Sequence, residues 1–297
     1  METIISPIDK EILRREISSL KKIRNTGHGD NEIYIFSAAE CPNLMREVGR
    51  LREEAFRLGG GGTGKDCDID ELDLDPEGYQ QLISWDPRTC DILGGYRFIV
   101  CRSSDVSTLS TEHYFTFSDK FRKEYLPHTI ELGRAFVRAY EGEAMKSIYA
   151  LDNLWDGIGA LIMANTDIKY LLGKVTMYDS YNVEARNLLL YFLYKYLGDK
   201  ETLLKGIHPL ESTIDTEKME HIFVGGSYDE DYKILRNTIR EHNEIIPPMM
   251  NAYMNLSHDM RVFETIHNPE LGNVYETGIL VTIANIYPDK FKRYTEW

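Results

Sequence analysis

Apolar residues gather along this chain in short runs bounded by polar and turn residues, which is the pattern of β-strands. Runs rich in β-branched and aromatic residues predict strands at residues 32–37, 80–84, 92–101, 129–137, 169–178 and 274–283. A further strand is predicted at about residues 66–70, where aspartates take every second position. Strands therefore dominate the first half of the chain.

Helical periodicity, with apolar residues three and four positions apart, predicts helices at residues 8–25, 41–58, 144–163 and 182–197. The second of these begins at Pro42 and ends at the glycines 59–62, which are common residues at the two ends of a helix. The last is apolar on nearly all sides, so we expect it to be a buried core helix.

The order of these elements predicts a single α/β domain over residues 1–297. We expect a mixed, central twisted sheet flanked by helices. Residues 1–30 would carry an N-terminal helix. The charged region 199–243 lacks a clear period and is predicted to be a helical insertion in the C-terminal half.

Composition narrows the class of protein. With 42% hydrophobic and 28% charged residues, the chain can form an ordinary globular core. Its net charge of −14 argues against a nucleic-acid-binding protein, which would present a basic face. No apolar run approaches the roughly 18 residues of a membrane span, and no secretory signal is recognisable. The four cysteines are scattered without ligand spacing, so we expect reduced thiols, no metal site and a cytoplasmic protein.

A glycine-rich segment, GGGGTGK at residues 59–65, has the spacing of a phosphate-binding P-loop. Asp66 follows, where Mg²⁺ coordination needs Ser or Thr. The segment also follows a predicted helix and precedes an acidic stretch, whereas a P-loop joins a strand to a helix N-terminus. We therefore interpret it as a turn, and Lys65 has no assigned role.

Acidic residues follow this turn. Asp66, Asp68 and Asp70 occupy alternate positions, and the alternation then slips by one residue to Asp73. A β-bulge near Asp70 would return Asp73 to the same face of the strand. A solvated loop and a calcium loop are the competing interpretations, but the glycine and distal glutamate of a calcium loop are missing.

Charged residues also interrupt two strongly apolar predicted strands. Glu131 and Arg134 lie in ELGRAFV, and Arg97 lies in GGYRF. Buried charges are unfavourable unless they are paired or used, so these residues are either a structural ion-pair network or part of a site. Simple alternation places Glu131 and Arg134 on opposite faces. The turn after this strand, RAYEG, leads into a helix and could bind an anion at the helix N-terminus.

Together these residues resemble the GNAT superfamily of acyltransferases. They are most similar to its branch containing ornithine- and glycine-type N-acyltransferases of aminolipid synthesis and N-acyl-homoserine-lactone synthases. The resemblance covers residues 45–145 best, and glycines replace the tryptophan that lactone synthases carry, so lactone formation is not expected. It rests on Arg52-x-x-x-Phe56-Arg57, Asp70-x-x-Asp73, Tyr96-Arg97 and Glu131-Leu132-x-Arg134.

The resemblance implies transfer of a long-chain, 3-hydroxy fatty acyl group to the α-amine of a small amino acid such as glycine or ornithine. The donor would be acyl carrier protein or acyl-CoA, without a bound cofactor, and the lipid product suggests a peripheral membrane contact. By resemblance, the catalytic carboxylates would be Glu131, Asp73 and Asp70. The substrate-binding residues would be Arg52, Phe56, Arg97 and Arg134, and the donor-binding residues Phe136, Val137, Arg138 and Gly142.

The RAYEGEA segment matches the pyrophosphate loop of acetyl-CoA enzymes poorly, which favours acyl carrier protein as the donor. Because carrier proteins are acidic, docking requires a basic patch. Its candidate residues are Lys120, Arg122, Lys123, Lys146 and Lys174. The alternatives are an acetyl-CoA-dependent small-molecule N-acetyltransferase and a non-catalytic GNAT-like binding protein. The helix at 182–197 would line an acyl groove only if it were not a core helix.

Overall fold

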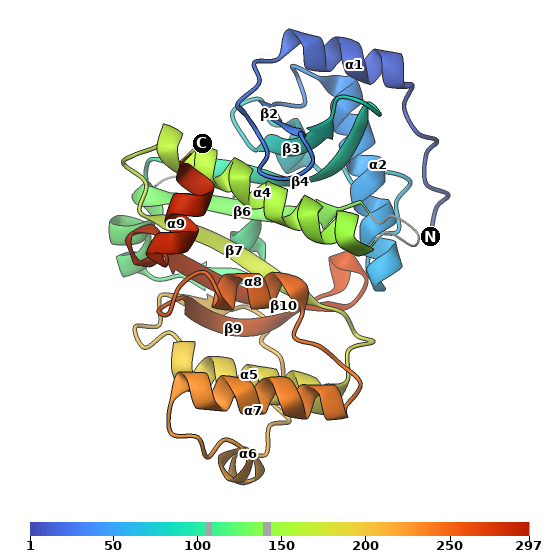
Figure 1. The fold of residues 1–297 in the computed structure, drawn as a ribbon. Helices are drawn as coiled ribbons and strands as arrows, with labels where there is room; N and C mark the ends of the chain where they lie inside the picture. Colours follow the sequence, from blue (N-terminus) through green and yellow to red (C-terminus); the bar gives the residue numbers. More distant parts are fainter. Residues whose placement is uncertain (105–108, 139–143, 297) are drawn as a thin grey trace.

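The centre of the protein is an eight-stranded sheet (Figure 1). The computed structural model describes residues 1–104, 109–138 and 144–296, with only the backbone of residues 144–148. Its strands lie in the order β1 (Arg24–Asn25), β2 (Glu32–Phe36), β3 (Gln80–Asp86), β4 (Asp91–Cys101), β6 (Thr129–Val137), β7 (Tyr170–Met177), β10 (Val274–Thr282) and β9 (Arg261–Asn268). All neighbouring pairs are antiparallel except β6 and β7, which run parallel.

Helices cover both faces of this sheet. Leu82 and Tyr96 pack with Leu154 of α4 (Ala144–Ala164), which crosses one face (Figure 1). Ile83 and Trp85 point the other way, into a core with α1 (Lys10–Ser19) and α2 (Pro42–Gly59). A smaller sheet joins β5 (Phe115–Phe117) to β8 (Leu204–Gly206). The remaining described α-helices are α3 (Glu71–Leu74), α5 (Val183–Leu197), α6 (Thr216–Ile222), α7 (Tyr228–Glu241), α8 (Pro248–Met254) and α9 (Pro288–Thr295).

The structure confirms the predicted α/β class and the main elements. Six of the strands, as well as α2, α4 and α5, lie within about two residues of their predicted bounds. Helix α5 is buried as a core helix, because Leu189 and Phe192 are inaccessible and the helix packs against α7. The first helix is shorter than predicted, and residues 24–25 form β1. Strands β5, β8 and β9 were not predicted, and the region 199–243 holds β8, α6 and α7.

The predicted strand at residues 66–70 is wrong. This segment belongs to neither sheet and crosses α2, where the Asp68 N–H donates to the carbonyl of Gly49 at 3.0 Å. Asp70 then caps the single turn α3 through its side chain. The alternating aspartates belong to an acidic loop that ends in a helix cap. Asp is a preferred N-cap residue, so its presence every second position did not require a strand.

In the described part of the chain, no helix combines the length and apolar character that crossing a membrane requires.

Candidate active site

A β-bulge interrupts strand β6. The pairing of β4 with β6 shifts register between Gly95 and Arg97, so that Arg134 and Ala135 together oppose one residue of β4. Arg134 has a φ of +49°, in the left-handed region that few non-glycine residues adopt. Such conformations cluster at functional sites, where the surrounding structure enforces them.

The bulge reverses which residues of β6 face each side of the sheet. Leu132 belongs to the core beneath α4, whereas Phe136, four residues later, belongs to the core beneath α2. Without the bulge, these two side chains would share a face. The expectation that Glu131 and Arg134 lie on opposite faces is therefore wrong, because the extra residue brings Arg134 to the face that Glu131 and Arg97 occupy.

Beyond this point β6 and β7 separate. Their pairing ends at Leu132 and Gly173, although β6 continues to Val137 and β7 to Met177. A cavity of about 660 Å³ fills the opening. Arg138 donates its N–H to Leu93 of β4, so strand alternation directs the N–H of Val137 towards the open side.

The cavity extends through the gap between the strands. Its wall includes all of residues 174–178, and successive side chains in a strand point to opposite faces of the sheet. On the α4 side the wall is apolar and includes Leu151, Leu154 and Met249. The other side includes the apolar Phe56 and Phe136 and a polar end. The polar end is formed by Arg134, Lys174 and further residues, namely Ser110, Tyr114, Thr176, Asn268 and Glu276. An apolar arm and a polar end meet where the strands part.

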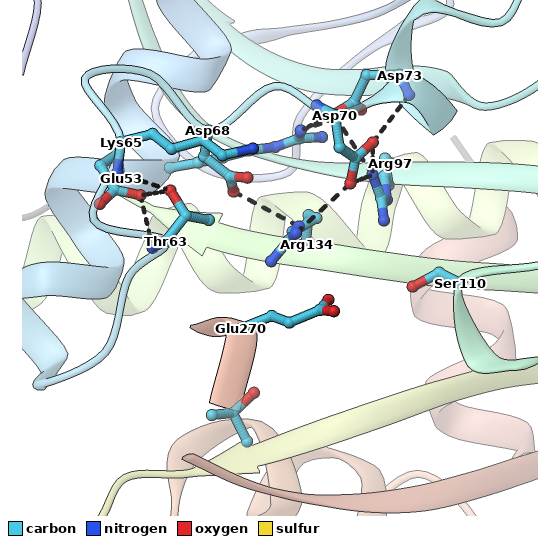
Figure 2. A network of polar contacts seen from close by, with 12 residues as sticks. Glu53, Thr63, Lys65, Asp68, Asp70, Asp73, Arg97, Ser110, Arg134 and Glu270 are labelled. Atoms are coloured by element: carbon cyan, nitrogen blue, oxygen red, sulfur yellow. Dashed lines mark hydrogen bonds and ion pairs between the residues drawn. The ribbon is translucent and has the colours of Figure 1, made fainter. Parts of the chain in front are cut away.

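Arginines and aspartates alternate in a network beside the bulge (Figure 2). The Arg52 Nη1 atom lies 3.0 Å from Asp73, and both side chains are inaccessible to solvent. Arg97 lies 2.7 Å from Asp70 and 3.4 Å from Asp73. Burial opposes charge on Arg97, but Asp73 and Asp70 outweigh it and raise the pKa of Arg97 above its usual value. These charges stabilise one another in the protein interior.

The capping geometry of α3 holds the two aspartates together. Asp70 accepts from the Asp73 N–H at 3.0 Å, and Asp73 accepts from the Asp70 N–H at 3.2 Å. This capping box does what the predicted bulge near Asp70 was expected to do. The bulge that matters for the site lies instead in β6.

Arg134 joins this network to the cavity wall. It lies 3.5 Å from both Asp68 and Asp70, beside which Figure 2 shows it, and it also lines the cavity. Burial opposes ionisation of Asp70, but Arg97 and Arg134 prevail and hold its pKa well below the usual value. For Asp68, 1% exposed, burial prevails over Arg134 and raises the pKa.

Glu131 has other partners. Tyr79 donates to its carboxylate at 2.7 Å, and the N–H and hydroxyl of Thr111 donate at 2.9 and 2.7 Å. Arg97 lies over the Tyr79 ring at 4.9 Å, which links Glu131 to the arginines. The structure thus brings Asp70 and Asp73 together and links Glu131 to them only indirectly, through Tyr79 and Arg97. These three carboxylates contact protein groups and do not line the cavity.

The glycine-rich turn encloses a carboxylate of the protein itself. Glu53, fully buried, accepts from the N–H groups of Thr63 and Gly64 at 2.9 and 2.8 Å and from Arg57 at 2.7 Å (Figure 2). Burial opposes ionisation of Glu53, but these donors outweigh it and lower its pKa. The turn therefore has an internal anion where a P-loop has a phosphate, and Lys65 is exposed beside it.

The residues predicted to bind the acyl donor are divided. Phe136 and Val137 line the cavity, as does Phe56, which was predicted to bind the substrate. Arg138 instead forms an ion pair with Asp91 at 2.8 Å. Gly142 lies outside the described residues.

Sequence reasoning missed the polar end of the cavity. Lys174 was a candidate for a docking patch, but its ammonium group contacts Ser110 and Thr111 at 3.2 and 3.4 Å. Glu276 and Asn268 were not considered. The sequence did contain a sign of this polar end, because Lys174 and Glu276 are charged residues inside the apolar strands KYLLGKVTMY and VYETGILVTI.

The other basic docking candidates are paired with acidic neighbours. Lys120 lies 3.2 Å from Glu201, Lys123 lies 3.8 Å from Asp119, and Arg122 pairs with Glu112. The side chain of Lys146 lies outside the described residues. Because each of Lys120, Arg122 and Lys123 pairs with an acidic residue, these three do not form a basic patch of unpaired charges.

Comparison with known proteins identifies the family. An acetyltransferase (GNAT) domain family matches residues 51–149. The glycine Nα-acyltransferases of Phocaeicola vulgatus and Bacteroides thetaiotaomicron are each 47% identical to the whole chain, which covers 93% and 90% of their lengths. The crystal structure of the AHL synthase LasI, 15% identical, aligns with 54% of this chain and 76% of its own at a TM-score of 0.35. The chain therefore belongs to the GNAT N-acyltransferase family that these two glycine Nα-acyltransferases represent, and it is an acyltransferase.

Proposed function

We propose that this protein transfers a long-chain, 3-hydroxy fatty acyl group from acyl carrier protein to the α-amine of a small amino acid, glycine or ornithine, for aminolipid synthesis. The observation that carries the proposal is the cavity between β6 and β7, which has an apolar arm and a polar end. Two relatives that share the full chain are named glycine Nα-acyltransferases, which favours glycine as the acceptor.

The apolar arm favours a long acyl chain. Each methylene group moved from water into such a site contributes about 0.8 kcal/mol, so a long chain gains binding energy that an acetyl group lacks. The arm lies beneath α4 and α8, where Leu154, Tyr253 and Met249 line it. An acetyl group would leave most of the 660 Å³ unfilled.

The separated strands suit the thioester. A backbone N–H of β6 on the open side, that of Val137, can stabilise the oxyanion that forms when the amine attacks. The helix α4 begins at Ala144, shortly after β6 in the sequence, and a helix N-terminus is suited to receive the pantetheine phosphate. In this arrangement the acyl chain extends along the apolar arm.

In this proposal the arginine–aspartate network lies on the side of the site where the amine acceptor binds. Asp70, Asp73 and Glu131, which do not line the cavity, act on the acceptor indirectly: with Arg52 they hold Arg97 and Arg134 in place, and Arg134 reaches the acceptor. Glu131→Gln and Asp73→Asn should each lower turnover roughly 10²-fold, because a small displacement of Arg134 misplaces the acceptor. Near wild-type turnover in both folded variants would show this assignment to be wrong.

Acyl carrier protein as donor is tested with purified components. The protein is incubated with glycine or ornithine and with 3-hydroxyacyl carrier protein, the matching acyl-CoA or acetyl-CoA, and products are identified by mass spectrometry. We expect N-acyl amino acid from the carrier protein. Product only from acetyl-CoA would support the acetyltransferase alternative, and no product from any donor would refute the proposal.

A cellular experiment tests the aminolipid role. Lipid mass spectrometry compares cells that overexpress the wild type, Arg134→Ala or the matched surface variant Arg14→Ala, whose side chain is largely exposed. A new N-acyl amino acid should appear with the wild type and Arg14→Ala alone. An unchanged lipid profile in all three strains would contradict this role, as would equal amounts with Arg134→Ala. Recovery of the protein with vesicles of the same lipids tests the peripheral membrane contact.

A further inference from the structure

Two opposite charges face the polar end of the cavity without pairing. Lys174 of β7 contacts two hydroxyl groups and lies 5.5 Å from the Tyr114 ring. Glu276 of β10, 6% exposed, accepts from Asn268 at 3.0 Å and from Thr176 at 3.4 Å. Within the described part of the chain, neither side chain has an oppositely charged group at ion-pair distance. Buried charges without such partners are unfavourable, so a ligand that supplies them would bind well.

The sheet register fixes the spacing of these two charges. Lys174 lies opposite Gly278, and Glu276 lies opposite Thr176, so Lys174 and Glu276 are diagonal neighbours on one face. Diagonal neighbours in an antiparallel pair have Cα atoms roughly 7–8 Å apart. Small groups of opposite charge fit between the ends of two such side chains.

The position of this pair relates it to the reaction. Lys174 is the first residue of β7 beyond the last pair with β6, so it stands where the strands part. The pair lies on the face opposite α4, whereas the apolar arm lies beneath α4. Two substrates could therefore enter from opposite faces and meet in the gap.

Resting on the proposed function, we infer that Lys174 and Glu276 form the acceptor subsite, with Lys174 binding the α-carboxylate and Glu276 the α-ammonium group of a small zwitterionic amino acid. Charge-assisted hydrogen bonds to both ends orient the nitrogen towards the thioester. Burial disfavours the charged lysine and lowers its pKa, while Glu276 and Glu131 oppose this. A bound carboxylate would favour the charged form further.

The subsite accounts for the proton transfers. Glu276 takes one proton from the ammonium group, and the neutral amine attacks the thioester carbonyl to form the C–N bond. The C–S bond then breaks as the carbonyl re-forms. The nitrogen gives its second proton to the leaving thiolate, directly or through water. The products are an amide and a thiol, and the proton on Glu276 returns to solvent.

The test separates the two ends of the acceptor. Steady-state kinetics are measured with glycine and with glycinamide, which lacks the carboxylate, for the wild type, Lys174→Met and Lys174→Arg. Lys174→Met should raise the KM for glycine about 10- to 100-fold and that for glycinamide much less. Lys174→Arg retains the charge and should restore much of the affinity for glycine. The exposed Lys205→Met is the matched control.

Glu276→Gln tests the other end. It should lower kcat about 10²-fold, and raising the pH should recover part of this loss because more of the amine is then neutral in solution. Thermal unfolding confirms that each variant is folded, and the exposed Glu220→Gln serves as control.

Three results would count against the subsite. The first is an equal effect of Lys174→Met on glycine and glycinamide, the second is no effect on glycine, and the third is a Glu276→Gln loss that pH does not change. Failure of the proposed function looks different, because the wild type would then acylate no amino acid, which overturns both proposals.

Discussion

Neutralising Asp73 by an Asp73→Asn substitution tests how the buried arginines are held. The carboxylate lies 3.0 Å from Arg52, whose side chain is fully buried, and Gln81 bridges the two. Asparagine leaves the guanidinium charge uncompensated and turns an amide donor towards it. Removing one partner of such a pair should lower the free energy of unfolding by about 3–5 kcal/mol.

A double-mutant cycle isolates the pair. Arg52→Met alone leaves Asp73 with a buried charge and should also destabilise, whereas Arg52→Met with Asp73→Asn removes both charges. We expect the double variant to lose about 2 kcal/mol less than the sum of the single losses. Denaturant unfolding followed by tryptophan fluorescence, to which the buried Trp85 and Trp155 contribute, measures all four proteins. Glu184→Gln, which breaks an exposed pair with Lys218, is the control and should change little.

Two results would refute this reasoning. A loss below about 1 kcal/mol in Asp73→Asn would show that the charge of Arg52 is compensated elsewhere. Strict additivity in the double variant would show that the two side chains do not interact energetically.

Three further outcomes follow from the same site. Asp68→Asn should raise thermal stability at neutral pH and weaken the hold on Arg134. Because the folded pKa of Asp68 is raised, the advantage should grow as pH rises through that value and vanish in acid; an advantage independent of pH would contradict it. Arg134→Val should be about 1–2 kcal/mol less stable than Arg134→Gly in chemical denaturation, because only glycine adopts a φ of +49° without strain; equal stabilities would argue against the bulge. Met249→Trp should fill part of the apolar arm and lower kcat/KM for a long acyl donor at least tenfold relative to a short one, and an unchanged ratio in competition assays would place the chain elsewhere.

Much of the fold follows from local patterns in the sequence. The strands at 92–101 and 129–137 are long, apolar and rich in β-branched residues, and the structure has them at nearly the predicted positions. Strand β9 was missed because RVFETIHN begins with Arg261 and carries Glu264 in its middle, so no clear apolar run marks it. Its strand character depends on pairing with β10, which a local pattern does not contain.

The candidate site was partly predictable for a related reason. Charges inside apolar strands drew attention to Arg97, Glu131 and Arg134, and the structure links all three in one network. The location of the bulge was not predictable, because an arginine in the left-handed region leaves no mark comparable to a glycine. Since that one residue decides which side chains share a face, strict alternation gave the wrong orientation.

The carboxylate of Glu53 inside the glycine-rich turn also bears on nucleotide binding. A free phosphate would have to displace an anion that is tethered to the same helix, and a tethered group has an effective concentration of millimolar or more. The Glu53 carboxylate thus occupies the N–H groups of the turn at all times, and it orders the turn before any substrate binds. A Glu53→Gln protein would lose the ion pair with Arg57, but the amide would still fill the turn.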